Sequence, residues 1–325
     1  MKAAAALLLC LALAASASAA PPELGLPIAC DIGKTCWVQQ YFDHDSTAGA
    51  RDYACGSETY DGHDGTDFRI RDTASHADVI ASAAGVVKAV RDGVADHLVE
   101  SDADRAAVHN RECGNGVVVD HGDGWQTQYC HLRMGSVAVK PGDRVARGTR
   151  LGEVGFSGLA AFPHVHLTVR RDGGSLDPFR GSAETAEACG GPANALWSAD
   201  TLAGLSYRQG DIIAFGFAPG AVDVARLESG TLTDTSPASN WPAMVAYLWA
   251  INLSAGDGVT VSLDGPGGIT AKNTVTLDRA KAQYLLFAGV KMPPQGWPSG
   301  IYQGRIAIGS GSAARLAQHW SFALD

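Results

Sequence analysis

Short apolar runs separated by glycine-containing turns constrain this chain more than any other feature of its sequence. Residues 117–119 and 126–129 are two such runs, and the letters between them at positions 121–124 are HGDG. Two β-forming runs joined by an Asp-Gly turn are typical of a β-hairpin. The sequence therefore predicts a mainly β protein built from short antiparallel strands.

The expected strands fall into two groups, separated by residues 181–195, which have the composition of a linker. In the first group we expect strands at 66–70, 84–90, 117–119, 126–129, 137–139, 151–155 and 165–169. In the second group the runs are spaced as in a β-sandwich, at 211–217, 244–253, 258–263, 274–277, 284–288, 300–308 and 319–324. Between two strands of the first group, residues 91–112 form a polar, acidic and partly helical insertion.

These patterns predict five segments. We expect a signal peptide at 1–19, an N-terminal arm at 20–60, a β-rich domain at 61–180, the linker at 181–195 and an accessory domain at 196–325. The first domain is expected to be an antiparallel sheet or barrel-like structure. The accessory domain is expected to be an immunoglobulin-like β-sandwich, in which Trp241, Trp249, Trp297 and Trp320 are core residues rather than a sugar-binding platform.

The first residues have the pattern of a secretory signal peptide. One lysine precedes an apolar run at 3–15, and an A-x-A arrangement of small residues ends at Ala19. The run is too short to span a bilayer comfortably, and no later segment is apolar for long enough. We therefore expect cleavage near Ala19 and export to the periplasm or the extracellular space.

Composition argues against a disordered chain and against a nucleic-acid-binding protein. The hydrophobic fraction of 46% and the charged fraction of 18% are the reverse of what a disordered chain shows. Lys and Arg number 25 against 34 Asp and Glu, and the chain has no basic stripe. Because nucleic-acid binding needs such a stripe, we expect no nucleic-acid partner.

Cysteines indicate a disulfide framework. Cleavage of the signal peptide would remove Cys10 and leave six of the 7 cysteines, an even number in an exported chain. We expect Cys30 to pair with Cys36, and Cys113 with Cys130 across the hairpin, which leaves Cys55 for Cys189. Since neighbours on a strand point to opposite faces, the second disulfide is expected behind His131.

Histidines and one aspartate form three compact motifs, with the letters GHDGTD at 62–67, YCHL at 129–132 and PHVHL at 163–167. On a strand, His164 and His166 point to the same face, which suits a metal, or a metal ligand beside a proton-transfer group. His63 and Asp67 add a nitrogen and a carboxylate. Two histidines and one aspartate leave a fourth position open, as in a catalytic zinc site, although manganese and cobalt accept the same ligands.

These motifs resemble those of the lysostaphin-type zinc endopeptidases, which cut peptide cross-bridges in bacterial cell walls. The resemblance covers roughly residues 60–180 and includes GHDGTDF, GNGVVVDHGDGWQTQYCHL, VKPGDRVARGTRLGEVGFSG and PHVHLTVR. It implies His63, Asp67 and His166 as zinc ligands, and His131 and His164 as unliganded catalytic histidines.

The resemblance implies an exported zinc endopeptidase that hydrolyses peptide bonds of peptidoglycan through a metal-bound water. Cleavage of a Gly-rich protein is the alternative within the enzyme class. Because some relatives have lost ligands, a non-catalytic wall-binding or amidase-activating module is the alternative outside it. The chain departs from the family at Cys130, where many relatives have a small residue, and in its long insertion. His121, in the hairpin turn, is expected to be structural.

Overall fold

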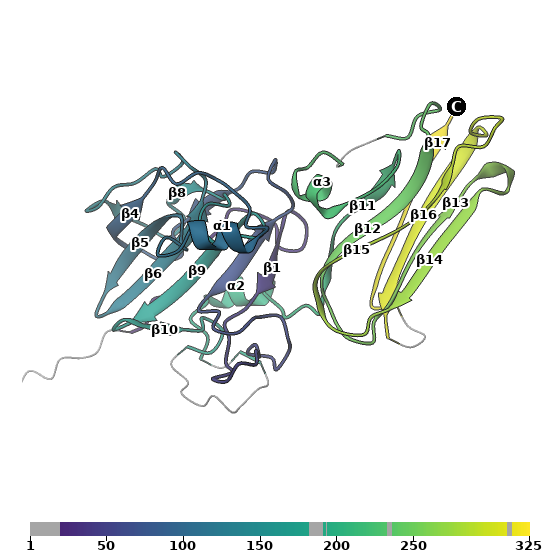
Figure 1. Cartoon of the computed structure of the whole chain (residues 1–325). Coiled ribbons are helices and arrows are strands. Elements are labelled where there is room, and N and C mark those ends of the chain that lie inside the picture. The colour runs from purple at the N-terminus through teal and green to yellow at the C-terminus, as the bar shows by residue number, and fades with distance from the viewer. Residues whose placement is uncertain (1–19, 182–190, 193, 233–235, 311–313) are drawn as a thin grey trace, which may run out of the picture.

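The computed structural model describes residues 20–181, 191–192, 194–232, 236–310 and 314–325, and it consists of two β domains in contact (Figure 1). The expected mainly β fold with antiparallel sheets is confirmed. The expected signal peptide and Cys189 lie outside the described residues. Among the described residues, no helix is long and apolar enough to cross a membrane.

An antiparallel sheet forms the N-terminal domain, in the order β1-β2-β9-β6-β5-β4-β7, with β10 paired to β9. Its strands are β1 Cys36–Gln40, β2 Thr66–Ile70, β4 Gly85–Arg91, β5 Asn115–Gly122, β6 Trp125–Leu132, β7 Arg144–Val145, β9 His164–Arg171 and β10 Gly174–Leu176. A separate pair joins β3 Asp78–Ile80 to β8 Arg150–Glu153. The sheet path is open, because β1 and β7 are its ends, so the domain is not a closed barrel.

Side-chain alternation sets the two faces of this sheet. In β9, Val165, Leu167 and Val169 enter the hydrophobic core, and the residues between them face the other way. The predicted hairpin is present as β5 and β6. Its turn residues Asp123 and Gly124 both have positive φ, of 49° and 82°, as a tight hairpin turn requires.

Three segments of the N-terminal half differ in detail from a simple run of strands. Residues 20–60 contribute β1, which pairs with β2 and therefore belongs to the sheet itself. Residues 137–139 do not form the expected strand, although the Ala138 amide donates a hydrogen bond to the Leu151 carbonyl. The acidic insertion contains helix α1 Asp102–Ala107, which begins with a capping box formed by Ser101 and Asp104.

The C-terminal domain is a sandwich of two antiparallel sheets. One has the order β11-β12-β15 and the other β14-β13-β16-β17. The strands are β11 Asp211–Ala218, β12 Ala243–Leu253, β13 Gly258–Asp264, β14 Thr270–Thr276, β15 Lys281–Lys291, β16 Gly300–Gly309 and β17 Leu316–Leu324. A single-turn helix, η1 Pro266–Gly268, precedes β14. Each expected strand of this half lies on one of these. Trp241, Trp249 and Trp297 are buried as expected, whereas Trp320 is only half-buried and packs against the edge of the core.

Two short helices lie outside the sheets. Helix α2 Ala199–Gly204 follows the linker, and α3 Val224–Glu228 follows β11. Figure 1 shows α3 on the side of the sandwich that faces the N-terminal domain. Trp37 of β1 packs with Trp249 of β12 in a third hydrophobic cluster, so the two domains share buried surface.

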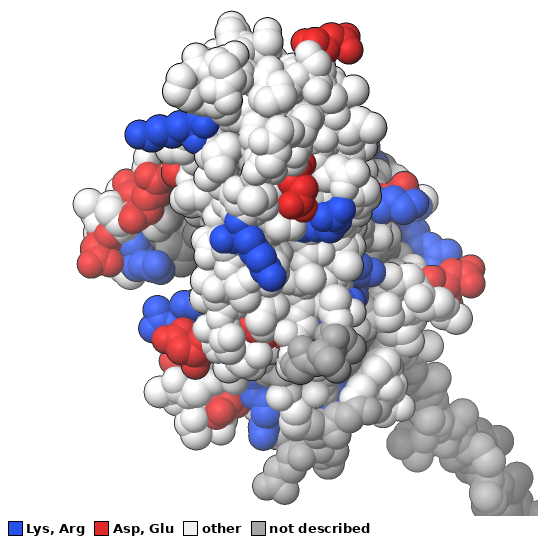
Figure 2. Space-filling view, turned by 90° about the vertical axis from the view of Figure 1, so that its right-hand side faces the viewer, with Lys and Arg blue, Asp and Glu red and all other residues white. Residues whose placement is uncertain are grey.

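The opposite face of the sandwich carries few charges. Figure 2 shows this face as mostly uncharged surface, on which acidic and basic groups lie near one another. Asp264 and Arg305, for example, form an ion pair of 2.6 Å. This face therefore has no single-sign patch that would attract a polyanion.

Two of the expected disulfides are present. Cys30 bonds to Cys36, and Cys113 bonds to Cys130. The pairing of Cys55 with Cys189 stays a prediction, because Cys189 is outside the described residues.

A buried carboxyl at the domain contact gives the first prediction. Asn252 donates hydrogen bonds to Glu58 Oε2 and to the Gln39 carbonyl. Burial, followed by the charge of Asp52, raises the pKa of Glu58 to about 8. Between pH 4.5 and about 8, Glu58 is therefore protonated in the folded protein, whereas in the unfolded chain it is ionised. Stability from this group should fall as pH rises from about 4.5 to 8.

We therefore expect Glu58→Gln to match the wild type at pH 5 and to exceed it by about 1–3 kcal/mol at pH 9. Chemical denaturation at both pH values measures the difference. Asp278→Asn, which changes an exposed carboxylate, is the control and should leave the pH dependence unchanged. Parallel pH dependences for the wild type and Glu58→Gln would contradict the prediction.

Candidate metal centre

Strand register brings the sequence motifs together on one face of the sheet. Asp67 of β2 lies opposite His166 of β9, and His166 lies opposite Cys130 of β6. Directly opposed residues of antiparallel strands share a face, so these three side chains form a row across the sheet. His63 lies in the loop before β2 and reaches the same row.

Three donor atoms converge at the centre of this row. His63 Nε2 lies 3.2 Å from Asp67 Oδ1 and 3.1 Å from His166 Nδ1, and the latter two atoms are 2.8 Å apart. All three residues are buried, with exposed fractions of 3% for His63 and Asp67 and 9% for His166. They are the residues that the sequence indicated as a ligand set.

The outer ring nitrogens of both histidines are anchored. His63 Nδ1 donates to the Tyr41 carbonyl at 2.6 Å. His166 Nε2 hydrogen-bonds Thr168 Oγ1 at 2.9 Å and lies 3.3 Å from Asp64 Oδ1. Partners of this kind fix the orientation of a ligating imidazole, so the inner nitrogens are held toward the centre.

Gly65 allows this close approach. A Cβ at position 65 would lie 2.5 Å from the Leu167 carbonyl oxygen and 2.6 Å from His166 Nε2. Both contacts are shorter than a real Cβ makes, which explains why the first motif has glycine at this position.

The donor set fits zinc. Two imidazole nitrogens and one carboxylate oxygen are its usual ligands in open, three-residue sites. Bonds of about 2.0–2.1 Å in tetrahedral geometry place donors about 3.3 Å apart, close to the separations found here. The group His63, Asp67 and His166 can thus hold one metal ion with little rearrangement.

His131 and His164 lie beside this group but are held differently. Each donates through Nδ1 to a main-chain carbonyl at 2.8 Å, His131 to Ser157 and His164 to Phe162. Their rings are 4.5 Å apart. His164 Nε2 lies 3.6 Å from Asp67 Oδ1. Both histidines therefore keep Nε2 available as a proton acceptor next to the three donor atoms.

His131 reaches the site because the backbone departs from regular strand geometry. His131 has φ of 64°, and the pairing of β5 with β6 shifts register between Asn115 and Val117. This irregularity breaks the alternation of side chains, so Cys130 and His131 turn to the same side. Both line a surface pocket with His166.

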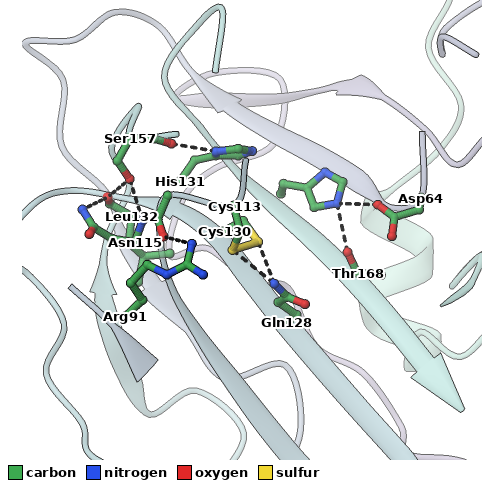
Figure 3. Close-up of a disulfide and its surroundings, with 12 residues drawn as sticks. Asp64, Arg91, Cys113, Asn115, Gln128, Cys130, His131, Leu132, Ser157 and Thr168 are labelled. Carbon is green, nitrogen blue, oxygen red and sulfur yellow. Dashed lines mark hydrogen bonds and ion pairs between the residues drawn. A yellow bond between two sulfur atoms is a disulfide. The ribbon is translucent and has the colours of Figure 1, made fainter. Parts of the chain in front are cut away.

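The expectation that the Cys113–Cys130 disulfide lies behind the site is therefore wrong. Its error was to assume regular alternation through His131. Figure 3 shows the disulfide beside His131, with Gln128 reaching both sulfurs. The His131 amide donates to the Cys113 carbonyl at 2.8 Å, so the disulfide segment also holds the irregular backbone in place.

Burial and neighbouring charges give the site groups distinct protonation tendencies. Burial lowers the pKa of His131 well below its ordinary value, and the nearby His164 and His166 add to this effect. Burial also lowers the pKa of His164, although Asp67 opposes it. For His166, burial is outweighed by Asp64 and Asp67, which raise its pKa to about 9. His131 and His164 are therefore neutral near pH 7.

Two pockets meet above these residues and share Tyr60, His131 and Leu159. One pocket of about 190 Å³ lies over His166 and the disulfide, and Arg170 is part of its wall. The other, of about 430 Å³, is lined by His164 and Phe162 and reaches Gln283 of the C-terminal domain. Together they form a groove that passes over the candidate metal centre.

Sequence reasoning missed several residues of this groove. Tyr60 falls within the predicted N-terminal arm, yet its ring lies 4.6 Å from that of His63. Asp64 belongs to the first motif, but the motif alone predicts no role for it. Because Asp64 lies between the expected ligands His63 and Asp67 in the sequence, its closeness to His166 could have been predicted. Arg105 and Gln283, from the insertion and the second domain, carried no such signal.

His121 does not join the site, as expected. Its Nδ1 hydrogen-bonds the Ala84 carbonyl at 2.8 Å, and its Nε2 the Thr127 hydroxyl at 2.9 Å. It therefore connects the hairpin to the preceding segment and has a structural role.

The fold and the donor set form a candidate single-metal site on an antiparallel sheet, with two additional histidines at its edge. The model described as Peptidase family M23 matches residues 61–178. This part of the chain is therefore similar to that peptidase family.

Curated relatives match over short segments. The chain is 43% identical over 53 residues to the peptidoglycan DD-endopeptidase ShyA of Vibrio cholerae serotype O1, which covers 16% of this chain and 12% of that protein. It is 44% identical over 57 residues to the cell division protein DipM of Caulobacter vibrioides, covering 18% and 9%. The match thus spans only a small part of each relative.

A solved structure of a zinc containing peptidase from Vibrio cholerae is also similar. Its sequence is 22% identical, and the match covers 48% of this chain and 39% of that one with a TM-score of 0.34.

The Cys113–Cys130 disulfide gives the second prediction. Replacing both cysteines by Ala should lower the free energy of unfolding by about 3 kcal/mol, because the bond closes a long loop. The matched control is Cys30→Ala with Cys36→Ala, which opens a much shorter loop and should cost less. Denaturant unfolding measures both values. Equal stability of the Cys113/Cys130 variant and the wild type would refute the prediction.

Proposed function

We propose that this protein is an exported zinc-dependent endopeptidase that hydrolyses peptide bonds of bacterial peptidoglycan. One observation carries the proposal: three buried donor atoms converge within hydrogen-bond distance, and two neutral histidines lie at their edge. The match of residues 61–178 to the model of a peptidase family supports the reaction type. The similarity to a peptidoglycan endopeptidase supports the substrate class and export.

In this proposal His63, Asp67 and His166 hold the metal. Zinc at this position would act as a Lewis acid on the scissile carbonyl and lower the pKa of the attacking water. Tyr41, Thr168 and Asp64 orient the ligands through the contacts described above.

His131 and His164 carry the proton transfers. Since each donates through Nδ1 to a carbonyl, each presents an unprotonated Nε2 to the site. Such a nitrogen accepts the proton of the attacking water. Once protonated, the same atom is a donor, which stabilises developing negative charge or delivers the proton to the leaving amine.

The groove above the centre is the proposed place of the peptide. Its two pockets share lining residues beside the candidate metal centre, so a chain that occupies both pockets would cross the centre. This geometry suits cleavage within a peptide rather than removal of a terminal residue.

Digestion of purified peptidoglycan by the zinc-loaded protein tests the proposal. Mass analysis of the released fragments should find new amino and carboxyl termini within the peptide part. A protein that binds the polymer but releases nothing would be a non-catalytic wall-binding module, and the proposal would fail. Release from a Gly-rich protein alone would contradict the substrate class.

The third prediction concerns the ligands. Substitution of His63, Asp67 or His166 by Ala should lose both zinc and turnover, because two donors do not hold the ion firmly. Metal content after dialysis, measured by mass spectrometry, checks each variant. Stoichiometric zinc in Asp67→Ala would exclude Asp67 as a ligand.

The fourth prediction separates the catalytic histidines from the ligands. His131→Ala and His164→Ala should retain zinc and lose about 10²–10⁴-fold in kcat. His121→Ala is the matched control and should keep zinc and kcat, since its contacts are structural. Loss of zinc from either catalytic variant would show that the residue is misassigned.

A further inference from the structure

Arg69 connects the candidate metal centre to the C-terminal domain. It lies on β2, two residues after Asp67, and is opposite His164 of β9. Its side chain is completely buried. A buried guanidinium needs charge and hydrogen-bond partners, and the partners of Arg69 come from both domains.

The C-terminal domain supplies the counter-charge. Arg69 Nη2 lies 3.3 Å from both carboxylate oxygens of Glu228, at the end of α3. Gln283 of β15 lies beside this carboxylate and, together with Arg69, opposes the rise in its pKa that burial causes. The Arg69 guanidinium carbon lies 5.0 Å from the ring centre of Trp249, on β12. Three elements of the second domain thus fix one side chain of the first.

On its other side Arg69 contacts the segment that orients His164. Its guanidinium carbon is 5.0 Å from the ring centre of Phe162. The Phe162 ring lies 4.5 Å from the His164 ring, and the Phe162 carbonyl accepts the His164 Nδ1 proton at 2.8 Å. Arg69 also donates to Gln39 Oε1 at 2.8 Å, which ties it to β1.

We infer that the C-terminal domain completes the active site, because Glu228 and Trp249 hold Arg69, and Arg69 holds the Phe162 segment that orients His164. Arg69 is then a positioning residue that touches neither metal nor substrate. The accessory domain in this account is a part of the catalytic structure and not only a spacer or a wall anchor. The kinetic consequence rests on the proposed function, but the orientation of His164 does not.

A double variant tests this inference in the full-length protein. Arg69→Met with Glu228→Leu replaces the buried ion pair by apolar side chains of similar volume, which commonly preserves folding. The control is Arg305→Gln with Asp264→Asn, which removes an exposed ion pair within the C-terminal domain. Both are compared with the wild type by thermal unfolding.

The first readout is independent of activity. Nitrogen-15 NMR of histidine rings in the metal-free protein reports the slowly exchanging Nδ1 proton of His164, assigned by its absence in His164→Gln. We expect this signal to shift or broaden in the Arg69/Glu228 variant and to stay unchanged in the control. An unchanged His164 signal in the folded double variant would overturn the inference.

The second readout is turnover with zinc bound. The double variant should retain zinc and keep KM within about twofold, while kcat falls about 10- to 100-fold, as expected for a misplaced catalytic group. Unchanged kcat would contradict the inference. If the wild type cuts no peptidoglycan, the proposed function fails, and the NMR comparison still decides the role of Arg69. If the double variant does not fold, the single substitution Glu228→Gln, which removes only the counter-charge of Arg69, is compared with the wild type in the same two readouts.

Discussion

The pairing of β2 with β9 is the constraint on which the rest of the site depends. This register sets Asp67 opposite His166 and Arg69 opposite His164. A slip of one residue would turn Asp67 toward the hydrophobic core, because side chains alternate along a strand. Phe68 and Val165, fully buried on the other face, hold the register in place. The same apolar contacts that stabilise the sheet therefore assemble the candidate metal centre.

Both domains contribute residues to the candidate site. The N-terminal sheet carries the proposed metal ligands, whereas the second domain contributes Gln283 to the groove and Glu228 to the support of Arg69. A buried ion pair is weak evidence for stability, since desolvation offsets much of its attraction. The Arg69–Glu228 pair lies beside His164, so its role can be one of positioning rather than stability. We interpret it as a device that fixes the geometry of the site.

Much of this arrangement was predictable from sequence, and the reasons are local. The H-x-H pair shares a face because strand alternation is regular through β9, and the Asp-Gly turn specifies the β5–β6 hairpin. The prediction failed where alternation breaks, at His131, and it placed the disulfide on the wrong side. Neither did it find Arg69 or Glu228, since their partnership depends on how the domains pack, which no local pattern encodes.

X-ray absorption spectroscopy at the zinc edge of the zinc-loaded protein tests the central claim most directly. The account predicts one ion bound by two imidazole nitrogens and by oxygen, at about 2.0–2.2 Å, with no sulfur neighbour. A sulfur ligand at about 2.3 Å would mean that Cys113 or Cys130 enters the site. That result, or a shell of more than two imidazoles, would contradict the ligand set His63, Asp67 and His166.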